Sequence, residues 1–380
     1  MSIRSGIHLA KTKEEKHAVY RFRYEVYVEE MGRYRGIADH ENRMLIEPED
    51  EYSRISYAAE DGKLVGTARL TWGGDGPLPR RQIETYQLEP FLAELPPEAV
   101  SVGERGMIAR HLRGSDLILE MMGSGLRFAN EKRIQVTFGA CEPHLLNLYL
   151  DLGHRTYSHY NINSPESGYL IPLLFMPEDV AYLKSLDSPL LEYVQNFGSD
   201  ARVPAVVRRI LSEGSAVTSR RLTSPGSYWG DVHEALRDLE GSRVSALHGL
   251  TEEEAARCLA KSNIIECDAG DRVLKKGGVA RNMFVVLDGM LEVRDGGKPV
   301  AVMEPGDVFG EMAFLLGRPR SKDVYAVTGG VRVLSLSEGT IQKMIESDPV
   351  IAARLLLNIS KMLCIRLLQQ GESTRRLNRE

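Results

Sequence analysis

The chain has 380 residues, of which 43% are hydrophobic and 27% charged, fractions that exclude wholesale disorder. This length exceeds one ordinary hydrophobic core and suits two domains. Lys and Arg number 48 against 53 Asp and Glu, and the net charge of -5 argues against a general nucleic-acid binder. No apolar run reaches a membrane span and the start lacks the order of a secretory signal. Four widely spaced cysteines predict a cytoplasmic protein without a disulfide framework or a metal site.

The first 180 residues alternate helix and strand signals. Thr12 and Glu15 form a capping box at the start of an amphipathic helix. Asp61-Gly62 suits the tight turn of a hairpin. Further strands are expected over 55–59, 64–72, 100–108, 134–139 and 168–175, with helices after Ser115 and over 143–152. We therefore expect a mixed α+β domain over residues 1–180.

Residues 181–245 are predicted to form a partly helical connector. Apolar residues at helical spacing occur between Leu190 and Phe197 and again between Val206 and Leu211. The stretches Ser212–Ser219 and Ser224–Ser227 have the composition of a linker.

Residues 246–380 follow a different pattern, in which short apolar strands are separated by glycines. Such closely spaced turns without long helices predict a β-barrel or jelly roll. A helical stripe formed by Leu356, Ile359, Leu363 and Leu367 indicates a C-terminal helix.

The stretch from Gly306 to Val324 has the composition of an anion site. A helical turn starting at Gly310-Glu311 would direct free backbone N–H groups outward. Arg320, ten residues after Gly310, can offer a planar guanidinium to phosphate oxygens. The alternative for Glu311 and Arg320 is an ordinary surface ion pair.

This stretch resembles the phosphate-binding cassette of cyclic nucleotide-binding domains, and the resemblance extends over about residues 246–370. It implies cAMP or cGMP as an effector, with Glu311 on the ribose 2′-hydroxyl and Arg320 on the cyclic phosphate. Gly310, Met312, Ala313 and Ser321 would complete the cradle, and the last helix would cover the base. Lys322 and Asp323 depart from the small residues usual there. Their charges either point outward or mark a domain that has lost its ligand.

A transcription factor with the same type of sensor would carry a helix-turn-helix after it. About a dozen residues follow the last predicted helix, too few for such a module. We therefore expect no nucleic-acid partner.

The segment from Cys141 to Tyr157 resembles the closing segment of the Gcn5-related N-acyltransferase fold. The resemblance implies that Tyr149 lies near the sulfur of an acyl thioester and protonates the departing thiolate. The strand over 100–108 would present backbone N–H groups to the thioester carbonyl. Glu104 is the expected catalytic base for the attacking amine, directly or through water.

The turn from Arg110 to Asp116 lacks the second glycine of the family's pyrophosphate-binding pattern, and Asp116 places a negative charge there. An acyl carrier protein donor presents a single phosphodiester in place of the pyrophosphate, so this turn would need to bind it less strongly. Carrier proteins are acidic, and Arg105, Arg110, Arg113, Arg127, Lys132 and Arg133 would supply a basic docking face. The expected donor-binding residues are Arg105, Ile108, Arg110, Arg113, Gly114 and Ser115.

The segment Arg21–Glu30 resembles the opening helix of the N-acyl amino acid synthases and the acyl-homoserine-lactone synthases. Glu49–Tyr52 and Gly66–Leu70 are similar to their acidic turn and following strand. The lactone-synthase pattern Glu-x-Ser-Arg is not intact after Glu104, which favours the amino acid synthase branch. On this resemblance Arg23 and Arg69 are expected to bind substrate.

These features together predict an acyltransferase that moves an acyl group, expected to be long, from a carrier-protein thioester to a small amine such as an amino acid. A cyclic nucleotide would regulate it by moving the helix at 352–368 and, through it, the connector. No permanently bound cofactor is expected. Two alternatives remain open: a coenzyme A-dependent acetyltransferase that uses acyl-CoA, and a noncatalytic cyclic-nucleotide sensor or adaptor.

Overall fold

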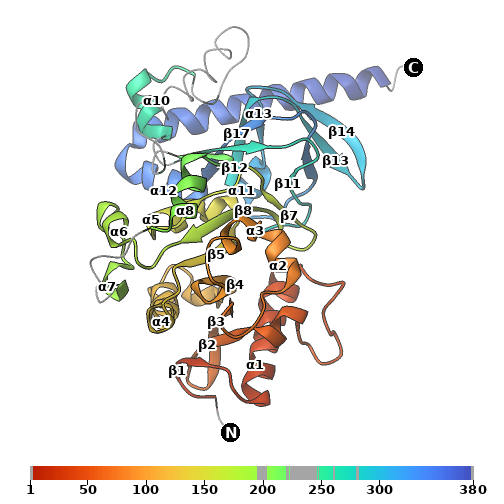
Figure 1. Ribbon diagram of the computed structural model, residues 1–380. Coiled ribbons are helices and arrows are strands. Elements are labelled where there is room, and N and C mark those ends of the chain that lie inside the picture. The colour runs from red at the N-terminus through yellow and green to blue at the C-terminus, as the bar shows by residue number, and fades with distance from the viewer. Residues whose placement is uncertain are drawn as a thin grey trace. The chain divides into compact units, whose positions relative to one another are not determined.

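The computed structural model in Figure 1 describes residues 3–194, 203–219, 222, 246, 248–259, 262–279 and 282–377. Contacts divide the chain into two compact units. Unit 1 comprises residues 1–141, 148–158 and 164–215, and unit 2 comprises 142–147, 159–163 and 216–380. The described residues of the predicted connector up to Ser215 group with unit 1.

An eight-stranded mixed sheet is the centre of unit 1. The strand order is β1-β2-β3-β4-β5-β8-β6, with β7 paired to β8. The neighbours β4 and β5 run parallel, and the pairs β1–β2, β2–β3, β3–β4, β5–β8 and β6–β8 are antiparallel. The strands are β1 (Gly6–Leu9), β2 (Arg54–Glu60), β3 (Lys63–Trp72), β4 (Val100–Ile108), β5 (Val136–Cys141), β6 (Arg155–Thr156), β7 (Ile162–Ser164) and β8 (Gly168–Phe175).

Helices bury the faces of this sheet. Val19 and Tyr20 of α1 pack on Ile55 and Tyr57 of β2, and Leu126 of α4 packs with Phe175 of β8. The α-helices before residue 216 are α1 (Lys13–Arg23), α2 (Arg80–Thr85), α3 (Glu89–Leu92), α4 (Leu117–Lys132), α5 (Leu146–Asp151), α6 (Val180–Ser185), α7 (Leu191–Val194) and α8 (Ala205–Ser212). Short 3-10 turns occupy η2 (Pro48–Tyr52), η3 (Pro97–Ala99), η4 (Arg110–Leu112) and η5 (Pro143–Leu145), and η1 (Tyr24–Glu30) is a π-helix.

Several local signals produce the structure that they predict. Thr12 Oγ1 accepts a hydrogen bond from Glu15 N at 3.2 Å while Glu15 Oε2 accepts from Thr12 N at 3.0 Å, which confirms the capping box. Asp61 and Gly62 both have positive φ, 48° and 76°, as a primed hairpin turn requires.

The parallel strands β4 and β5 are paired over only part of their length. Val100–Val102 pair with Val136–Phe138, after which β4 continues with β3 alone and β5 with β8 alone. The parallel ladder therefore ends after Val102–Phe138, with Gly139 still close to Gly103 O. We call the region of β4 and β5 beyond these glycines the strand opening. Backbone N–H groups of β4 there lie outside the β4–β5 ladder and can serve a ligand.

Unit 2 contains two antiparallel sheets, as expected for a jelly roll. Their orders are β15-β12-β17-β10-β9 and β11-β16-β13-β14. The core includes Met283, Leu336 and Leu355. The strands are β9 (Val217–Ser219), β10 (Asn263–Cys267), β11 (Arg272–Leu274), β12 (Asn282–Asp288), β13 (Leu291–Asp295), β14 (Lys298–Met303), β15 (Val308–Phe309), β16 (Asp323–Ala326) and β17 (Val331–Ser337), with helices α10 (Glu252–Leu259), α11 (Glu311–Leu316), α12 (Glu338–Ser347) and α13 (Pro349–Leu377).

Two described parts of the predicted connector pack with larger elements. Leu183, Leu190 and Val194 are buried with Leu126 and Phe175, so α6 and α7 belong to the core of unit 1. The Ser-rich stretch before residue 220 is not wholly a linker, because Val217–Ser219 pairs with β10. Phe197 and the stretch Ser224–Ser227 lie outside the described residues.

Among the described cysteines, Cys141 and Cys267 are buried and Cys364 is exposed. Over the part of the chain that the structure describes, no helix is both long enough and apolar enough to cross a membrane.

Candidate functional site

A β-bulge in β4 places two consecutive charged side chains in one network. Arg69 pairs with Glu104 across the ladder and Thr67 pairs with Met107, so β4 carries one extra residue between these pairs. Arg105 takes the left-handed conformation there, with φ +55°. In a regular strand neighbouring side chains point to opposite faces. The bulge removes that alternation, so Glu104 and Arg105 both contact the same cluster.

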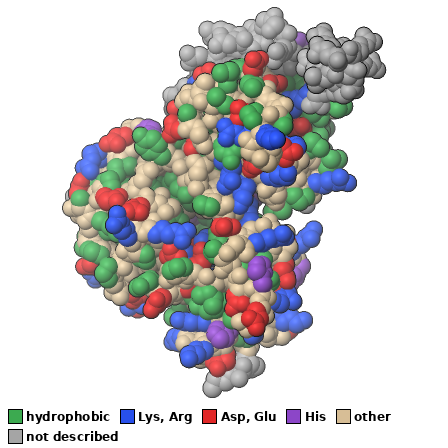
Figure 2. All heavy atoms as spheres, turned by 90° about the vertical axis from the view of Figure 1, so that its right-hand side faces the viewer, with side chains coloured by type: hydrophobic (Ala, Val, Ile, Leu, Met, Phe, Trp, Pro, Cys, Tyr) green, Lys and Arg blue, Asp and Glu red, His purple; other side chains and the backbone are tan. Residues whose placement is uncertain are grey.

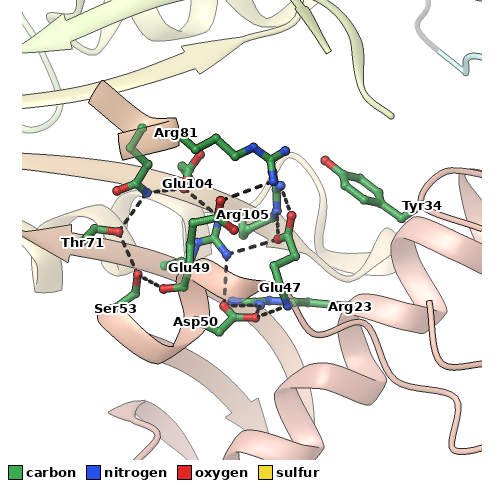
Figure 3. A network of polar contacts seen from close by, with 12 residues as sticks. Arg23, Tyr34, Glu47, Glu49, Asp50, Ser53, Thr71, Arg81, Glu104 and Arg105 are labelled. Atoms are coloured by element: carbon green, nitrogen blue, oxygen red, sulfur yellow. Dashed lines mark hydrogen bonds and ion pairs between the residues drawn. The ribbon is translucent and has the colours of Figure 1, made fainter. Parts of the chain in front are cut away.

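The cluster is a buried network of ion pairs, shown in Figure 3. Arg69 Nη2 donates to Glu104 Oε2 at 2.7 Å, and its Nη1 donates to Glu47 and Asp50 at 3.2 Å each. Arg23 Nη1 donates to both oxygens of Asp50 at 2.7 and 2.9 Å. Arg105 forms a bidentate pair with Glu47. Three arginines thus neutralise three carboxylates, as buried charges require.

This pairing determines the protonation of the two central carboxylates. Burial alone would raise the pKa of Glu47, but hydrogen bonds from Arg105 and the charges of Arg105, Arg69 and Arg23 lower it to about 2. Burial also opposes ionisation of Glu104, and the charges of Arg69 and Arg105 outweigh it and lower its pKa. Both groups are therefore carboxylates at neutral pH.

Glu104 retains acceptor capacity on one side. Its Oε2 accepts from Arg69 and from Gln82 Nε2, each at 2.7 Å. Its Oε1 accepts from the Tyr86 hydroxyl at 3.0 Å. The Glu104 side chain is 13% exposed whereas that of Arg69 is 1% exposed. Glu104 is thus the member of this pair that a substrate can approach.

Tyr149 lies on α5, next to His154. The two rings form an edge-to-face pair with centroids 4.9 Å apart, and His154 N donates to Tyr149 O at 2.9 Å. Burial raises the pKa of the Tyr149 phenol, so it stays protonated and able to donate. Burial lowers the pKa of His154 to about 4, so His154 is neutral at pH 7.

Three arginine predictions change in the light of the structure. Arg23 is 0% exposed and bonded to Asp50, so it supports the network instead of reaching a substrate. Arg69 is likewise enclosed by carboxylates. Arg105 is bonded to Glu47, with its guanidinium 5.0 Å from the Tyr34 ring centroid and 15% of its side chain exposed, so its charge is mostly engaged within the network.

Sequence reasoning missed the partners Glu47, Gln82 and Tyr86. The acidic turn at Glu49–Tyr52 gave a partial signal for the region that holds Asp50. The short helix α2, which carries Gln82, has no motif of its own.

The turn between β4 and α4 carries four of the six predicted donor-binding residues, and the other two, Arg105 and Ile108, lie in β4. Arg110 is exposed, and Gly114 adopts φ +89°. Ser115 Oγ donates to Leu112 O at 2.7 Å. Arg113 is engaged within the protein, because it donates to both oxygens of Glu30 at 2.6 and 2.9 Å and to Ile108 O at 3.2 Å. Basic and acidic side chains are intermixed over the face shown in Figure 2.

In unit 2 the predicted cassette forms between β15 and β16. Gly310 precedes α11 with φ +78°, and a Cβ there would lie 2.6 Å from Arg320 Nη1. Arg320 Nη1 donates to Gly310 O at 2.5 Å, and its Nη2 donates to Asn282 O and Oδ1 at 2.5 and 2.7 Å. The sequence thus correctly places Arg320 back over Gly310.

Arg320 has donor capacity left over. It is 4% exposed, and its Nε is buried without a hydrogen-bond partner. A guanidinium carries five N–H groups, and the bonds to Gly310 and Asn282 use three of them. Burial lowers its pKa to about 10, so it remains cationic at pH 7. A buried cation with free donors is suited to an anionic ligand.

The other cassette residues occupy different environments. Glu311 is 9% exposed and Ala313 3% exposed, whereas Met312 and Ser321 are exposed. Glu311 Oε1 lies 3.6 Å from Nη1 of Arg366 on α13. Arg366 also donates to Val308 O at 2.7 Å and lies 3.6 Å from Asp307. The C-terminal helix is therefore tied to the cassette.

Lys322 and Asp323 have partners beside the cassette. Lys322 is ion-paired with Asp295, and Asp323 Oδ1 accepts from Lys276 N at 2.9 Å. Lys322 is thus paired with a carboxylate, and Asp323 accepts a backbone hydrogen bond.

Comparisons with known proteins agree with the class of this second site. Residues 264–348 match the cyclic nucleotide-binding domain family. The Pycsar effector protein XpPycTIR of Xanthomonas perforans is 31% identical over 116 residues, 30% of this chain and 38% of that protein. Glutaminase 2 of Bradyrhizobium diazoefficiens is 34% identical over 119 residues, 31% of this chain and 19% of that protein. The chain therefore spans well under half of these relatives.

A solved structure of a CoA-dependent acyl-homoserine lactone synthase is also similar, with 17% identity and a TM-score of 0.37 over 52% of this chain and 92% of that one. The C-terminal part of the chain is thus a cyclic nucleotide-binding domain, preceded by a mixed-sheet α+β domain.

Proposed function

We propose that the chain is an N-acyltransferase under cyclic-nucleotide control, which moves an acyl group from a carrier-protein thioester to an amino acid or a similar small amine. The observation that supports this most is the opening between β4 and β5 beside the buried carboxylate Glu104. A thioester in this opening would meet β4 backbone N–H groups at its carbonyl oxygen.

The reaction balances with groups of this chain. The bound ammonium first gives one proton to solvent, and the neutral amine nitrogen then attacks the thioester carbon and gives a second proton through water to Glu104. The C–N bond forms and the C–S bond breaks. The leaving thiolate takes a proton from the Tyr149 phenol, which solvent then restores. The products are an amide and a free thiol. The low pKa of Glu104 suits a group that holds and orients an ammonium and receives its proton only through water.

Regulation follows from the second site. A cyclic nucleotide would place its phosphate on the free donors of Arg320 and its ribose on Glu311. Because Glu311 also pairs with Arg366, ligand binding and the position of α13 are expected to be linked. A ligand controls the enzyme only if it binds one arrangement more tightly than the other.

The proposed function has two versions, which differ in whether the acyl donor is a carrier-protein thioester or a coenzyme A thioester. A carrier-protein thioester is favoured because Asp116 precedes α4 at the place where a coenzyme A pyrophosphate would need positive charge. Supplying palmitoyl carrier protein or palmitoyl-CoA to the purified protein, with the twenty amino acids as acceptors, separates the two. N-acyl product from the carrier thioester alone supports the proposal, and product from the CoA ester alone supports the coenzyme A alternative. The absence of product with both donors contradicts acyl transfer.

A further inference from the structure

The helix that carries Tyr149 begins in unit 2. Residues 142–147 and 159–163 belong to unit 2, whereas the segment 148–158 between them belongs to unit 1. The helix α5 therefore starts with residues of unit 2 and continues into the segment that holds Tyr149. Contacts that fix residues 142–147 within unit 2 also constrain the first turn of this helix, because α5 is one continuous hydrogen-bonded element.

Two asparagines, Asn147 and Asn161, flank segment 148–158, and both are bonded to β10. Asn263 on β10 donates from Nδ2 to Asn147 Oδ1 at 3.1 Å. Asn161 Nδ2 donates to Glu266 O of the same strand at 3.0 Å. All four residues belong to unit 2. A shift of β10 would therefore be felt at both ends of the segment that holds Tyr149.

Asn263 is also one of three buried polar residues on three adjacent strands of unit 2. Asn282 on β12, Ser335 on β17 and Asn263 on β10 are 2%, 4% and 2% exposed. Asn282 Nδ2 donates to Ser335 Oγ at 3.2 Å. Ser335 and Asn263 are direct partners in the antiparallel ladder, which places their side chains on one face with Cβ atoms about 4.5–5.5 Å apart. The three residues thus form a continuous polar row across the sheet.

The row ends at the cassette on one side and at α5 on the other. Arg320 Nη2 donates to Asn282 O and Oδ1 at 2.5 and 2.7 Å, and Asn263 donates to Asn147 as described above. We call the five residues that join the cassette to α5 the polar relay. Its members, in order, are Arg320, Asn282, Ser335, Asn263 and Asn147.

The relay crosses an otherwise apolar part of unit 2. Ile264, Met283 and Leu334, the sequence neighbours of its strand residues, lie in the hydrophobic core. Hydrogen bonds in such surroundings depend on one another, because each buried polar group needs its partner. Within the described residues, Asn263 Oδ1 is buried without a hydrogen-bond partner. The relay therefore has one hydrogen bond still to be formed and can adopt more than one arrangement.

We propose that Asn263 is a positioning residue for α5 and that the polar relay carries nucleotide binding from Arg320 to the helix that holds Tyr149. This inference rests on the proposed function for its meaning, since Tyr149 is the proton donor there. The ligand is the cyclic phosphate, and the element that responds to it is the first turn of α5.

Competition for the guanidinium provides the physical link. A phosphate on Arg320 uses the N–H groups that otherwise hold Asn282. The amide of Asn282 then changes its hydrogen bonds, and with them those available to Ser335 and Asn263. The bond from Asn263 to Asn147 is strengthened or weakened as a result. Two sites are coupled in this way when the element between them has two arrangements that both sites bias.

Hydrogen–deuterium exchange of the full-length protein tests the relay without turnover. Either cAMP or cGMP is added at saturating concentration, and mass spectrometry follows peptides that cover α5 and, as an internal reference, α1. We expect one nucleotide to change the exchange rate of α5 amides by about 5-fold or more, the lower end of typical coupling between two sites, and to leave α1 unchanged. An α5 indifferent to both nucleotides, or a wild type that binds neither, overturns the proposal.

Ser335→Ala and Ser219→Ala form a matched pair of variants. Both serines are buried ladder partners of Asn263, on its opposite sides, and Ser335 is the one on the side of Arg320. Ser335→Ala should bind nucleotide within about 3-fold of the wild type and lose the response of α5, whereas Ser219→Ala should keep it. A response that both variants keep, or that both lose, contradicts the relay.

Asn147→Ala replaces Ser335→Ala if the latter fails to fold by circular dichroism or fails to bind nucleotide. It breaks the relay at the end away from the cassette, so nucleotide binding should persist and the response of α5 should be lost. A response of α5 as large as that of the wild type contradicts the relay.

Turnover gives a readout that a merely structural role would not move. The ratio of initial rates with and without nucleotide should be several-fold in the wild type and in Ser219→Ala and about 1 in Ser335→Ala. A general loss of activity leaves this ratio unchanged, and the same ratio in all three proteins contradicts the relay. A wild type that forms no amide while α5 still responds to nucleotide would remove the proposed function and support the relay.

Discussion

Arg69 on β3 and Glu104 on β4 are direct cross-strand partners, and their side chains meet at 2.7 Å. Arg69 simultaneously contacts Glu47 and Asp50. The cation therefore links the carboxylate nearest to the strand opening with two others deeper in the protein. We therefore expect a replacement of Glu104 to affect mainly activity and a replacement of Arg69 to affect mainly stability.

Glu104→Gln should remove acyl transfer while retaining the fold. The amide preserves the shape and an oxygen for Arg69 but cannot take a proton, and loss of such a group typically costs on the order of 100-fold or more. Lipid extracts from a host that produces the variant, analysed by mass spectrometry beside the wild type, provide the measurement. Equal N-acyl product from both would rule out Glu104 as the base.

Arg69→Met should destabilise unit 1 by about 3–5 kcal/mol, because it leaves Glu104, Glu47 and Asp50 without their shared cation in a buried site. Urea unfolding measures the change. Arg80→Met is the control, since Arg80 forms an exposed pair with Glu84 and its loss should cost less than about 1 kcal/mol. Similar unfolding midpoints for the two variants would contradict the account of the network.

Tyr149→Phe should lower kcat without changing stability. Phenylalanine keeps the edge-to-face packing on His154, so only the proton donor is lost. The expected fall is about 10- to 100-fold with a good leaving thiolate. Tyr57→Phe, which removes a hydroxyl bonded to Glu15, is the comparison and should leave kcat unchanged. An unchanged kcat for Tyr149→Phe would assign this residue to packing.

Arg320→Gln should abolish cyclic-nucleotide binding, with a loss of at least about 100-fold in affinity for cAMP and cGMP, because the buried cation is the group expected to hold the phosphate. Arg318→Gln, at an exposed position two residues earlier, should bind as the wild type does. Calorimetry with both nucleotides gives the answer. Absence of heat for the wild type would instead identify a domain that has kept the fold and lost its ligand.

Stability should fall with acid in two stages. His154 has a folded pKa of about 4, below its ordinary 6.5, so the unfolded chain binds the proton more readily and stability declines from pH 6.5 toward 4. Glu47, with a folded pKa of about 2 against 4.5, contributes stability above pH 4.5 that is lost between 4.5 and 2, on the order of 3 kcal/mol. Urea midpoints measured from pH 7 to pH 3 that stay constant would contradict both assignments.

The sequence predicted what local chemistry determines. Thr12 and Glu15 specify a helix start, Asp61-Gly62 specifies a turn, and β4 forms over the predicted residues 100–108. The ten-residue spacing between Gly310 and Arg320 predicted that Arg320 returns to the same place in the fold. These signals need only neighbours in the chain.

What the sequence did not reveal depends on distant pairing. The bulge at Arg105 arises from how β4 pairs with β3, and it makes a predicted surface arginine a half-buried partner of Glu47. Gln82 on α2 contacts Thr71 of β3 and Glu104 of β4, which the sequence alone does not indicate. Val217–Ser219 has the composition of a linker. It forms a strand because it pairs with β10, which lies far from it in the sequence.

The central claim is that a cyclic nucleotide controls acyl transfer by this chain. The most direct measurement is the initial rate of N-acyl amino acid formation from palmitoyl carrier protein by the purified full-length protein, with and without cAMP or cGMP, in wild type and in Arg320→Gln. We predict that one nucleotide changes the wild-type rate several-fold and leaves the rate of the variant unchanged. A wild-type rate indifferent to both nucleotides, or an equal response in the variant, would contradict it.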